Sequence, residues 1–305
     1  MPARSSTLDG FVQGLLYRGR EGHLSFIGHR LGGIGLVLFL TIHIADTSLA
    51  YFWPAGYSHA IDLYRTVPLM LGEMVLVAAA LFHGVNGLNI IFRDTFPHLW
   101  SKRAEASSFW RVLGVTGLLW LPTAFIMGRS LYVYNFCRTC NESVLSPAAV
   151  AARTNFVLAA VPILYLGVLG VLVWGASLRR PAVKRQAGIL PQRTLETYAW
   201  LFMRLSGVLL IPLVWGHVLI QDVAIGVHAI DVAYVAARWG HRLWQVYDIA
   251  LLALAFGHGI YGLWGIAVDY VHRPGLLKAV RLVCAGVWVV LTVIGAWAVV
   301  GLAVR

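Results

Sequence analysis

Apolar residues fill seven stretches of the chain, each near or above twenty residues in length. The stretches cover 26–52, 67–92, 109–127, 155–178, 199–220, 244–270 and 277–303. A helix that crosses a bilayer needs about 20 such residues. No stretch alternates apolar and polar positions as the strands of a membrane β-barrel do. The pattern predicts an all-α polytopic membrane protein with about seven transmembrane helices.

The composition agrees with a membrane location. Hydrophobic residues make up 59% of the 305 residues and charged residues only 12%, whereas a soluble domain carries about 25% charged residues. Residues 1–25 are polar and contain no apolar core followed by a small-residue cleavage site, so we expect no removable signal peptide. We expect 1–25 to be an inner-face segment, and the first helix to direct insertion.

The basic residues are distributed unevenly between the predicted loops. The net charge is +11; with the N-terminus inside, the inner segments carry fifteen Lys or Arg, and the outer segments with the C-terminus carry seven. This asymmetry follows the positive-inside rule and predicts a multi-pass protein of a prokaryotic plasma membrane with a cytoplasmic N-terminus. The placement favours contact with lipid or an acidic partner on the inner face and argues against nucleic acid.

One helical unit occurs twice in the chain. The segment 26–52 carries Arg30 and, thirteen residues later, His43, and the segment 199–220 carries Arg204 and His217 at the same spacing. The next helix of each unit contains a His-Gly-x-x-Gly motif. Each motif has an acidic residue ten positions before its histidine and an Asp eleven positions after it. The residues are Glu73, His83 and Asp94 in the first unit and Asp248, His258 and Asp269 in the second.

The repeat predicts two parallel three-helix units, 26–130 and 199–305. A three-helix unit that begins inside ends outside, so one more crossing is needed before the second unit can begin inside. The intervening region 131–198 supplies an outer loop, a linking helix at 155–178 and a basic inner linker. Parallel repeats of this kind are related by an axis along the membrane normal.

Four histidines lie within otherwise apolar helices: His43, His83, His217 and His258. Ionisable residues at membrane depth are expensive and usually functional. A single such histidine is more often a buried imidazole bonded to a carbonyl, but two matched pairs favour ligation of haem b. The symmetry places His83 with His258 and His43 with His217 at equal depths, although pairing within a repeat, His43 with His83, stays open. We expect two haems, and one at minimum.

Other residues near the histidines suit a flat anionic cofactor. The glycines of each motif either let a porphyrin approach the backbone or pack helices together. Arg30 and Arg204 lie near the inner helix ends, where a guanidinium suits a haem propionate or a quinone carbonyl or merely snorkels. His29, beside Arg30, is a further candidate for the propionate.

The remaining candidates carry weaker signals. Cys137 and Cys140 in the outer loop are compatible with a disulfide, a metal site or two inert thiols, and Cys284 lies in the last helix. The chain has no dinucleotide-binding glycine motif and no cysteine set for an iron–sulfur cluster. Four further histidines lie in predicted loops and are interpreted as ordinary surface residues: His98, His228, His241 and His272.

These features resemble the cytochrome b membrane anchor of succinate:quinone oxidoreductase (succinate dehydrogenase or fumarate reductase). In many members of that family the anchor is two subunits of three helices each. Residues 20–130 resemble the first and residues 198–303 the second. The residues that carry the resemblance are Ser25, His29, Arg30 and His83 in the first half and Arg204, His258, Asp269 and Tyr270 in the second.

The resemblance implies roles for individual residues. His83 and His258 match the axial ligands of the haem nearer the iron–sulfur subunit. The additional pair His43 and His217 resembles members with two haems. The quinone site is expected at Arg30, Ser25, Asp269 and Tyr270; Tyr270 matches a tyrosine that hydrogen-bonds a quinone carbonyl. Ser25 stands one position away from the family's serine, whose place Phe26 holds.

The resemblance also implies partners. We expect flavoprotein and iron–sulfur subunits on the inner face, which oxidise succinate in the tricarboxylic acid cycle or reduce fumarate, and menaquinone or ubiquinone in the membrane. The chain itself is expected to transfer electrons rather than to act on succinate. Two other functions fit part of the pattern: a cytochrome b subunit of a hydrogenase or formate dehydrogenase, and a parallel-repeat transporter without haem.

Overall fold

The computed structural model describes residues 20–96, 101–137, 140, 166, 167, 170 and 194–302. The predicted linking helix at 155–178 lies outside the described residues apart from three positions. The basic linker 179–193, most of the N-terminal segment and His98 also lie outside them.

Six long helices form the body of the described part. They are α2 (Glu21–Phe52), α4 (Val67–Thr95), α5 (Lys102–Phe136), α8 (Leu195–Val218), α10 (Arg242–Tyr270) and α11 (Pro274–Leu302). Each is long and apolar enough to cross a membrane, α8 together with the turns that follow it. The described residues contain no strand, so the all-α polytopic fold is confirmed.

Several helices extend beyond the apolar stretches that predicted them. α2 begins at Glu21 rather than near residue 26, α5 continues to Phe136, and α8 begins at Leu195. Polar caps explain some of these ends, because a side-chain oxygen can satisfy one of the free amides of a first turn. The hydroxyl of Ser101 accepts from the amide of Ala104, and Thr194 caps α8 in the same way.

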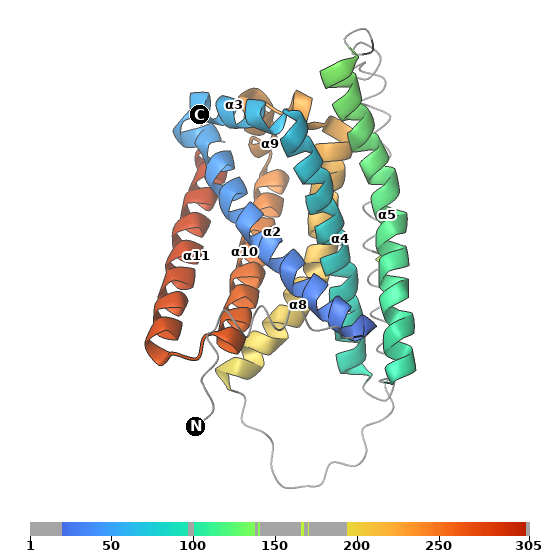
Figure 1. Ribbon diagram of the computed structural model, residues 1–305. Helices are drawn as coiled ribbons and strands as arrows, with labels where there is room; N and C mark the ends of the chain where they lie inside the picture. Colours follow the sequence, from blue (N-terminus) through green and yellow to red (C-terminus); the bar gives the residue numbers. More distant parts are fainter. Residues whose placement is uncertain are drawn as a thin grey trace.

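Two short helices cross one end of the bundle (Figure 1). α3 (Pro54–Tyr64) follows the first helix of the first half, and α9 (Val232–Trp239) occupies the corresponding place in the second half. We call this the outer end and the opposite one the inner end, after the orientation predicted from the charges. Hydrophobicity did not reveal these helices, because each is far shorter than a membrane span.

α8 does not end in a simple turn. It continues as the π-helical segment η3 (Leu219–Ile225) and the single turn η4 (Val227–Ala229). Gly226 closes η3 with a positive φ of 82°, a conformation that glycine adopts without strain. Such π-helical turns occur frequently at functional sites.

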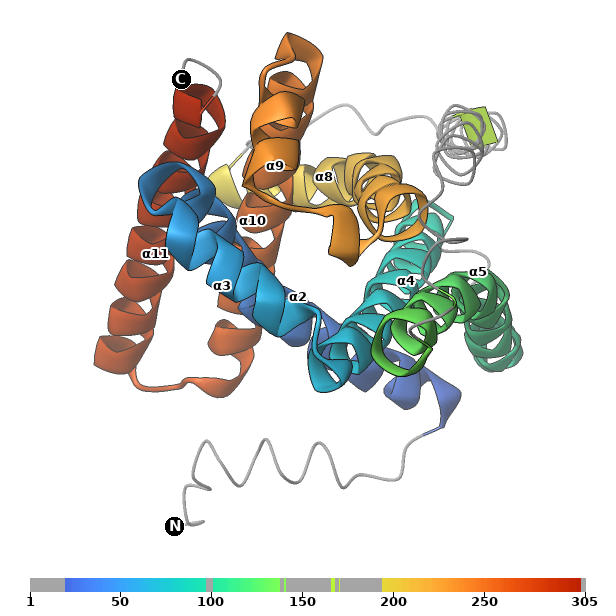
Figure 2. The same ribbon diagram turned by 90° about the horizontal axis from the view of Figure 1, so that it is seen from above.

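α2 lies at the centre of the arrangement. It runs obliquely across the bundle in Figures 1 and 2 and packs against α4, α5, α10 and α11. α4 packs against α5 and α8, and α10 packs against α8 and α11. The two halves therefore meet chiefly where α2 packs against α10 and α11, with a smaller contact between α4 and α8. The candidate histidines lie on α2, α4, α8 and α10.

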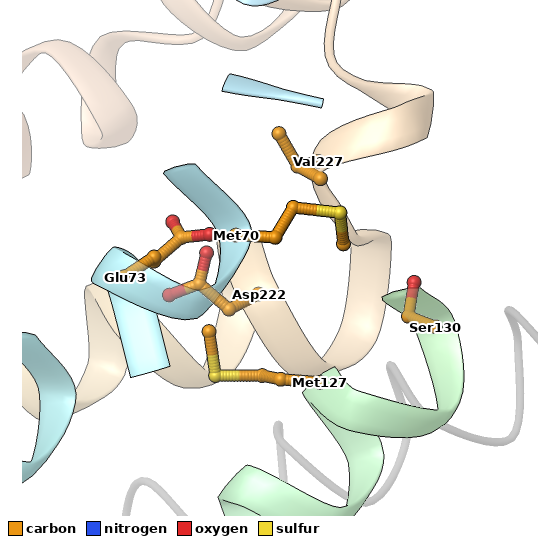
Figure 3. A pocket seen from close by; sticks show the side chains of 6 residues that line it. All are labelled: Met70, Glu73, Met127, Ser130, Asp222 and Val227. Carbon is orange, nitrogen blue, oxygen red and sulfur yellow. The ribbon is translucent and has the colours of Figure 1, made fainter. Parts of the chain in front are cut away.

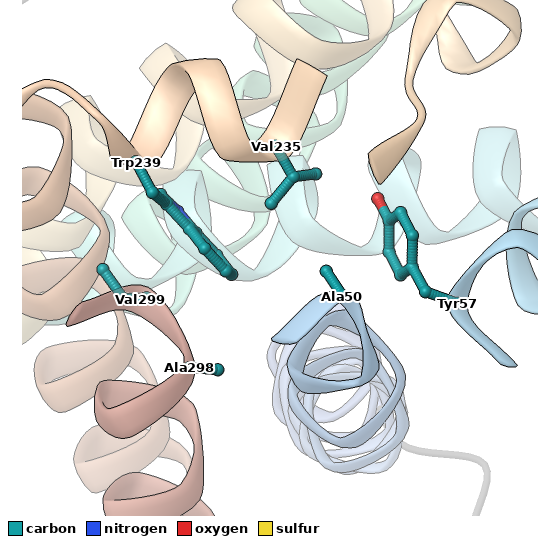
Figure 4. Packing of buried hydrophobic residues seen from close by; sticks show 6 residues of the cluster. All are labelled: Ala50, Tyr57, Val235, Trp239, Ala298 and Val299. Atoms are coloured by element: carbon teal, nitrogen blue, oxygen red, sulfur yellow. The ribbon is translucent and has the colours of Figure 1, made fainter. Parts of the chain in front are cut away.

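The outer end is held by a hydrophobic cluster (Figure 4). Ala50, Tyr57, Val235 and Trp239 come from α2, α3 and α9, and Ala298 and Val299 come from α11. Many large apolar side chains elsewhere on the helices stay exposed, as expected for surfaces that face lipid. The cluster fixes α9 over the outer ends of α2 and α10.

Two loop interpretations change with the structure. His228 is not an ordinary surface residue: its ring stacks on Tyr134 of α5, with centroids 3.4 Å apart, and burial together with the Arg65 charge lowers the pKa of His228 to about 4. Cys137 and Cys140 form a disulfide at the end of α5, one of the outcomes that the sequence left open.

Candidate functional site

The inner pair of histidines comes from the second helix of each half. The rings of His83 on α4 and His258 on α10 face each other with centroids 6.4 Å apart and planes at 85°. His29 of α2 stacks on His83 with centroids 3.9 Å apart. The structure therefore brings together the pair that the symmetry predicted, and it places His29 directly beside it.

Each inner histidine is oriented through its Nδ1 atom. His83 Nδ1 lies 2.9 Å from the carbonyl oxygen of His29, to which it can only donate. His258 Nδ1 lies 2.9 Å from Ser206 Oγ, and that hydroxyl donates its own proton to the carbonyl of Phe202 at 2.6 Å. Both rings therefore carry their proton on Nδ1 and keep the lone pair on Nε2, as a metal ligand with a second-shell partner requires.

The outer pair is built in the same way from the first helix of each half. His43 on α2 and His217 on α8 have ring centroids 6.1 Å apart and planes at 82°. Phe39 stacks on His43 at 5.1 Å. Nδ1 of His217 is buried without a hydrogen-bond partner, so among the described residues nothing orients it as Ser206 orients His258.

The ring separations fit a metal ion held between two imidazoles. Metal–nitrogen bonds of about 2 Å, together with about 1.1 Å from each nitrogen to its ring centre, give centroids roughly 6.2 Å apart. The observed values, 6.4 and 6.1 Å, bracket that figure. No group of three or more potential metal-binding side chains occurs among the described residues.

The two histidine pairs lie at different levels along α2. A Cβ on Gly33 would lie 3.0 Å from the His83 ring, so the inner pair lies beside Gly33. His43 is ten residues further along the same helix, which is about 15 Å at 1.5 Å per residue.

The motif glycines lie where helices cross, and equivalent contacts occur in both halves. A Cβ on Gly259 would lie 2.7 Å from Val37 Cγ2, and one on Gly84 would lie 3.9 Å from Ile211, the residue equivalent to Val37. The glycines at the end of each motif, Gly87 and Gly262, face His29 and its equivalent Met203. These contacts favour helix packing as the role of the motif glycines.

Two crossed ion pairs join the halves at the inner end. Arg30 of α2 pairs with Asp269 of α10, and Arg204 of α8 pairs with Asp94 of α4. Arg30 also donates to the hydroxyl of Tyr270 at 3.5 Å. Each arginine thus takes its carboxylate from the other half, a pairing that the sequence comparison of the repeats did not predict.

The predicted quinone residues do not all meet. Arg30, Asp269 and Tyr270 form one cluster between α2 and α10. Ser25 turns instead toward α4, where its hydroxyl donates to the side-chain oxygen of the buried Asn86 at 2.7 Å. Asn86, three residues after His83, was not among the residues that the sequence suggested. An amide side chain within an otherwise apolar helix is the signal that could have identified it.

Two propionate candidates have unsatisfied donor positions. Nδ1 of His29 and Nε of Arg204 are buried and have no hydrogen-bond partner within the described part of the chain. A buried polar atom without a partner costs roughly 1–3 kcal/mol. An anionic group on the inner side of the His83–His258 pair would remove that cost.

The equivalent acids Glu73 and Asp248 have different surroundings. The carboxyl of Glu73 lies beside that of Asp222 in the π-helical segment. Both line a small pocket between α4, α5 and η3 (Figure 3). Asp248 accepts instead from both Arg238 and Trp239.

Comparisons with known proteins agree with these features. The profile of the succinate dehydrogenase/fumarate reductase transmembrane subunit family matches residues 14–123 and 177–296, which together exceed half of the chain. The chain is also similar to the succinate dehydrogenase 2 membrane subunit SdhC of Mycobacterium tuberculosis (strain ATCC 25618 / H37Rv). The two are 34% identical over 115 residues, 37% of this chain and 82% of that protein.

Proposed function

This chain belongs to the succinate dehydrogenase/fumarate reductase transmembrane subunit family, and from that premise we propose that it is a haem b-binding membrane anchor that passes electrons between an iron–sulfur subunit and membrane quinone. The observation that carries the proposal is the pair of facing histidine sets, His83 with His258 and His43 with His217. Family membership argues against a hydrogenase-type cytochrome and against a transporter.

The chain's own residues suit haem at both levels. His83 and His258 would hold the inner haem through Nε2, with the His29 carbonyl and Ser206 keeping both rings in the required tautomer. His43 and His217 would hold the outer haem. Arg204 through Nε and His29 through Nδ1, two buried atoms without a partner among the described residues, would bind propionates. A bound haem supplies one-electron oxidation and reduction, with a potential that depends on its axial ligands and nearby charge.

Quinone would bind at the inner cluster of Arg30, Asp269 and Tyr270. The Tyr270 hydroxyl oxygen accepts from Arg30, and in the proposed complex the same hydroxyl would donate to a quinone carbonyl. Asp269 neutralises Arg30 and keeps the guanidinium in place. Ser25 would contribute indirectly, through Asn86, rather than as a direct contact.

The partners would be a flavoprotein and an iron–sulfur subunit on the inner face of a bacterial plasma membrane, with menaquinone or ubiquinone as the lipid-soluble carrier. Electrons would enter near the inner haem and reach quinone at Tyr270. A second haem would extend electron transfer toward the outer end, where Glu73 and Asp222, which line one pocket, would serve proton transfer.

The haem content of the complex tests the proposal. The complex is purified from its own membranes, and haem b is measured per chain together with the copurifying subunits and succinate:quinone activity. We expect two haems per chain, a flavoprotein and an iron–sulfur protein. A colourless preparation that fails to take up added haem would overturn the proposal.

The assignment of each pair is tested by His43→Leu. We expect one of two haem components to disappear from the reduced spectrum while the other persists, because each cross-repeat pair holds its own iron. His59→Leu, which removes a histidine from the short outer helix α3, is the matched control and should leave both components. Loss of both components in His43→Leu would favour ligation within a repeat.

A further inference from the structure

Arg238 and Asp248 form the least exposed of the ion pairs among the described residues. Nε and Nη2 of Arg238 donate to the two carboxylate oxygens at 2.9 and 2.8 Å, and the indole of Trp239 donates to the same carboxylate at 3.0 Å. The two side chains are only 6% and 12% exposed. Removing two charges from water to this degree costs several kcal/mol. Such a cost suggests a role of the pair besides holding α9 against α10.

The ion pair lies about one helical turn outside the outer histidines. A Cβ on Gly295 of α11 would meet both Leu252 at 3.0 Å and Ile44 at 3.2 Å, so these two residues share a level. Ile44 adjoins His43, and Asp248 precedes Leu252 by four residues, about 6 Å along α10.

A second contact ties the same turn of α10 to α8. The hydroxyl of Tyr247, next to Asp248, donates to the carbonyl of Leu213 on α8. Leu213 precedes His217 by four residues on that helix. Contacts with α11 and with α8 therefore agree in placing Asp248 close to the outer pair.

The negative end of the ion pair is the one nearer the histidines. Asp248 lies on α10, one turn from the level of His43, whereas Arg238 lies on α9, which crosses the outer end of the bundle. Burial alone would lower the pKa of the Arg238 guanidinium, but hydrogen bonds and charge from Asp248 hold it above its ordinary value. The Arg238 guanidinium therefore stays charged beside the Asp248 carboxylate.

We propose that the Arg238–Asp248 ion pair is a tuning element of the outer site, which sets the reduction potential of the redox group held between His43 and His217. The inference rests on the proposed function, because it needs an iron at that pair. A fixed carboxylate stabilises the more positive, oxidised iron, so the pair lowers the outer potential below the value that the same site would have without it. Little solvent or salt screens it at this depth.

Redox titration of the purified complex tests the inference, with both haems followed in the same sample. Asp248→Asn leaves Arg238 uncompensated and should shift the outer haem to higher potential, while the inner haem stays at its wild-type value. Asp248→Glu keeps the charge and should keep the potential. Asp62→Asn, which removes an exposed carboxylate from an outer ion pair, is the matched control and should shift neither haem.

A neutral double variant covers the case in which Asp248→Asn fails to fold. Arg238→Gln with Asp248→Asn removes both charges, leaves no buried ion unpaired and keeps groups that can hydrogen-bond. Its outer potential should lie between those of the wild type and Asp248→Asn. Loss of the nearer, negative charge raises the potential, and loss of the more distant, positive charge partly offsets that rise. A merely structural role predicts no such order.

The outcomes separate this inference from the proposed function. Two haems with an outer potential that stays at the wild-type value in every folded variant would overturn the tuning role and leave the function intact. A wild-type complex with one haem, retained in His43→Leu, would overturn the outer haem itself and the tuning role with it. A selective shift in the stated order would support the inference.

Discussion

Ser206 shows how much of the site depends on a single hydroxyl. It is buried on α8, donates to its own helix at Phe202 and accepts from His258. By accepting from Nδ1, the serine leaves Nε2 as the nitrogen of His258 that is available to a metal. The corresponding atom of His83 is held by a backbone carbonyl, which no substitution can remove directly.

We predict that Ser206→Ala weakens haem binding at the inner pair by roughly 10–100-fold, the usual effect of losing a second-shell partner. Haem retention during purification and the spectrum of the inner haem measure it. Ser48→Ala is the control, because Ser48 is also buried and bonds to its own helix but touches no candidate ligand. Equal retention in both variants would show that Ser206 only packs.

At the scale of residues, the sequence was informative where a chemical group recurred. Matched spacing identified the four histidines, the two arginines and the two aspartates. It did not identify Ser206, because alanine or glycine is as common at such a helix crossing and nothing equivalent occurs in the first half. Nor did it show that Asp94 and Asp269 each pair with an arginine of the other half. Spacing along one helix carries no information about which helix packs against it.

The crossing of α10 over α2 depends on glycine at position 259. A Cβ there would lie 2.7 Å from Val37 Cγ2, and a β-branched side chain cannot turn away freely. We predict that Gly259→Ala destabilises the folded protein by about 1–3 kcal/mol, the usual cost of overpacking. The thermal unfolding midpoint in detergent should fall accordingly.

Two further variants make that prediction specific. Gly265→Ala lies on the same helix in open space and should not lower the midpoint. Val37→Ala combined with Gly259→Ala should recover stability, because it removes the clashing methyl groups. A midpoint that stays low in the combination would mean that Gly259 is required for backbone flexibility rather than for space.

Elements were predictable in proportion to their length. A run of about 20 apolar residues has few explanations besides a membrane span, and the six described spans all match predicted ones. The short helices α3 and α9 gave no such signal, although Pro54 and the Asp231 cap mark their first residues. The π-helical turn is invisible to any 3.6-residue pattern because it inserts a wider turn into an otherwise regular helix.

Over the whole molecule, the crossed ion pairs should contribute to the joining of the halves. Both pairs are partly exposed, so each is worth about 1 kcal/mol at most. We predict that Asp94→Arg and Arg204→Asp each lower the unfolding midpoint, because like charges then face each other. The double variant should restore most of the loss, since it rebuilds the pair in reverse.

Asp62→Arg serves as the matched control for that swap, because the exposed Asp62 pairs with Arg65 at the end of its own helix. Its effect should not be relieved by either change at positions 94 and 204. Failure of the double variant to recover stability would mean that Arg204 acts through another group, such as a propionate, rather than through Asp94.

Neither ion pair closes within one half of the molecule. In an anchor made of two separate subunits, such pairs form only after two chains meet in the membrane. Here a covalent connection holds the partners together at a high effective concentration, which does not depend on how much of each is synthesised. Formation of the interface that would hold the cofactors is therefore unimolecular, and dilution into detergent cannot leave one half without the other.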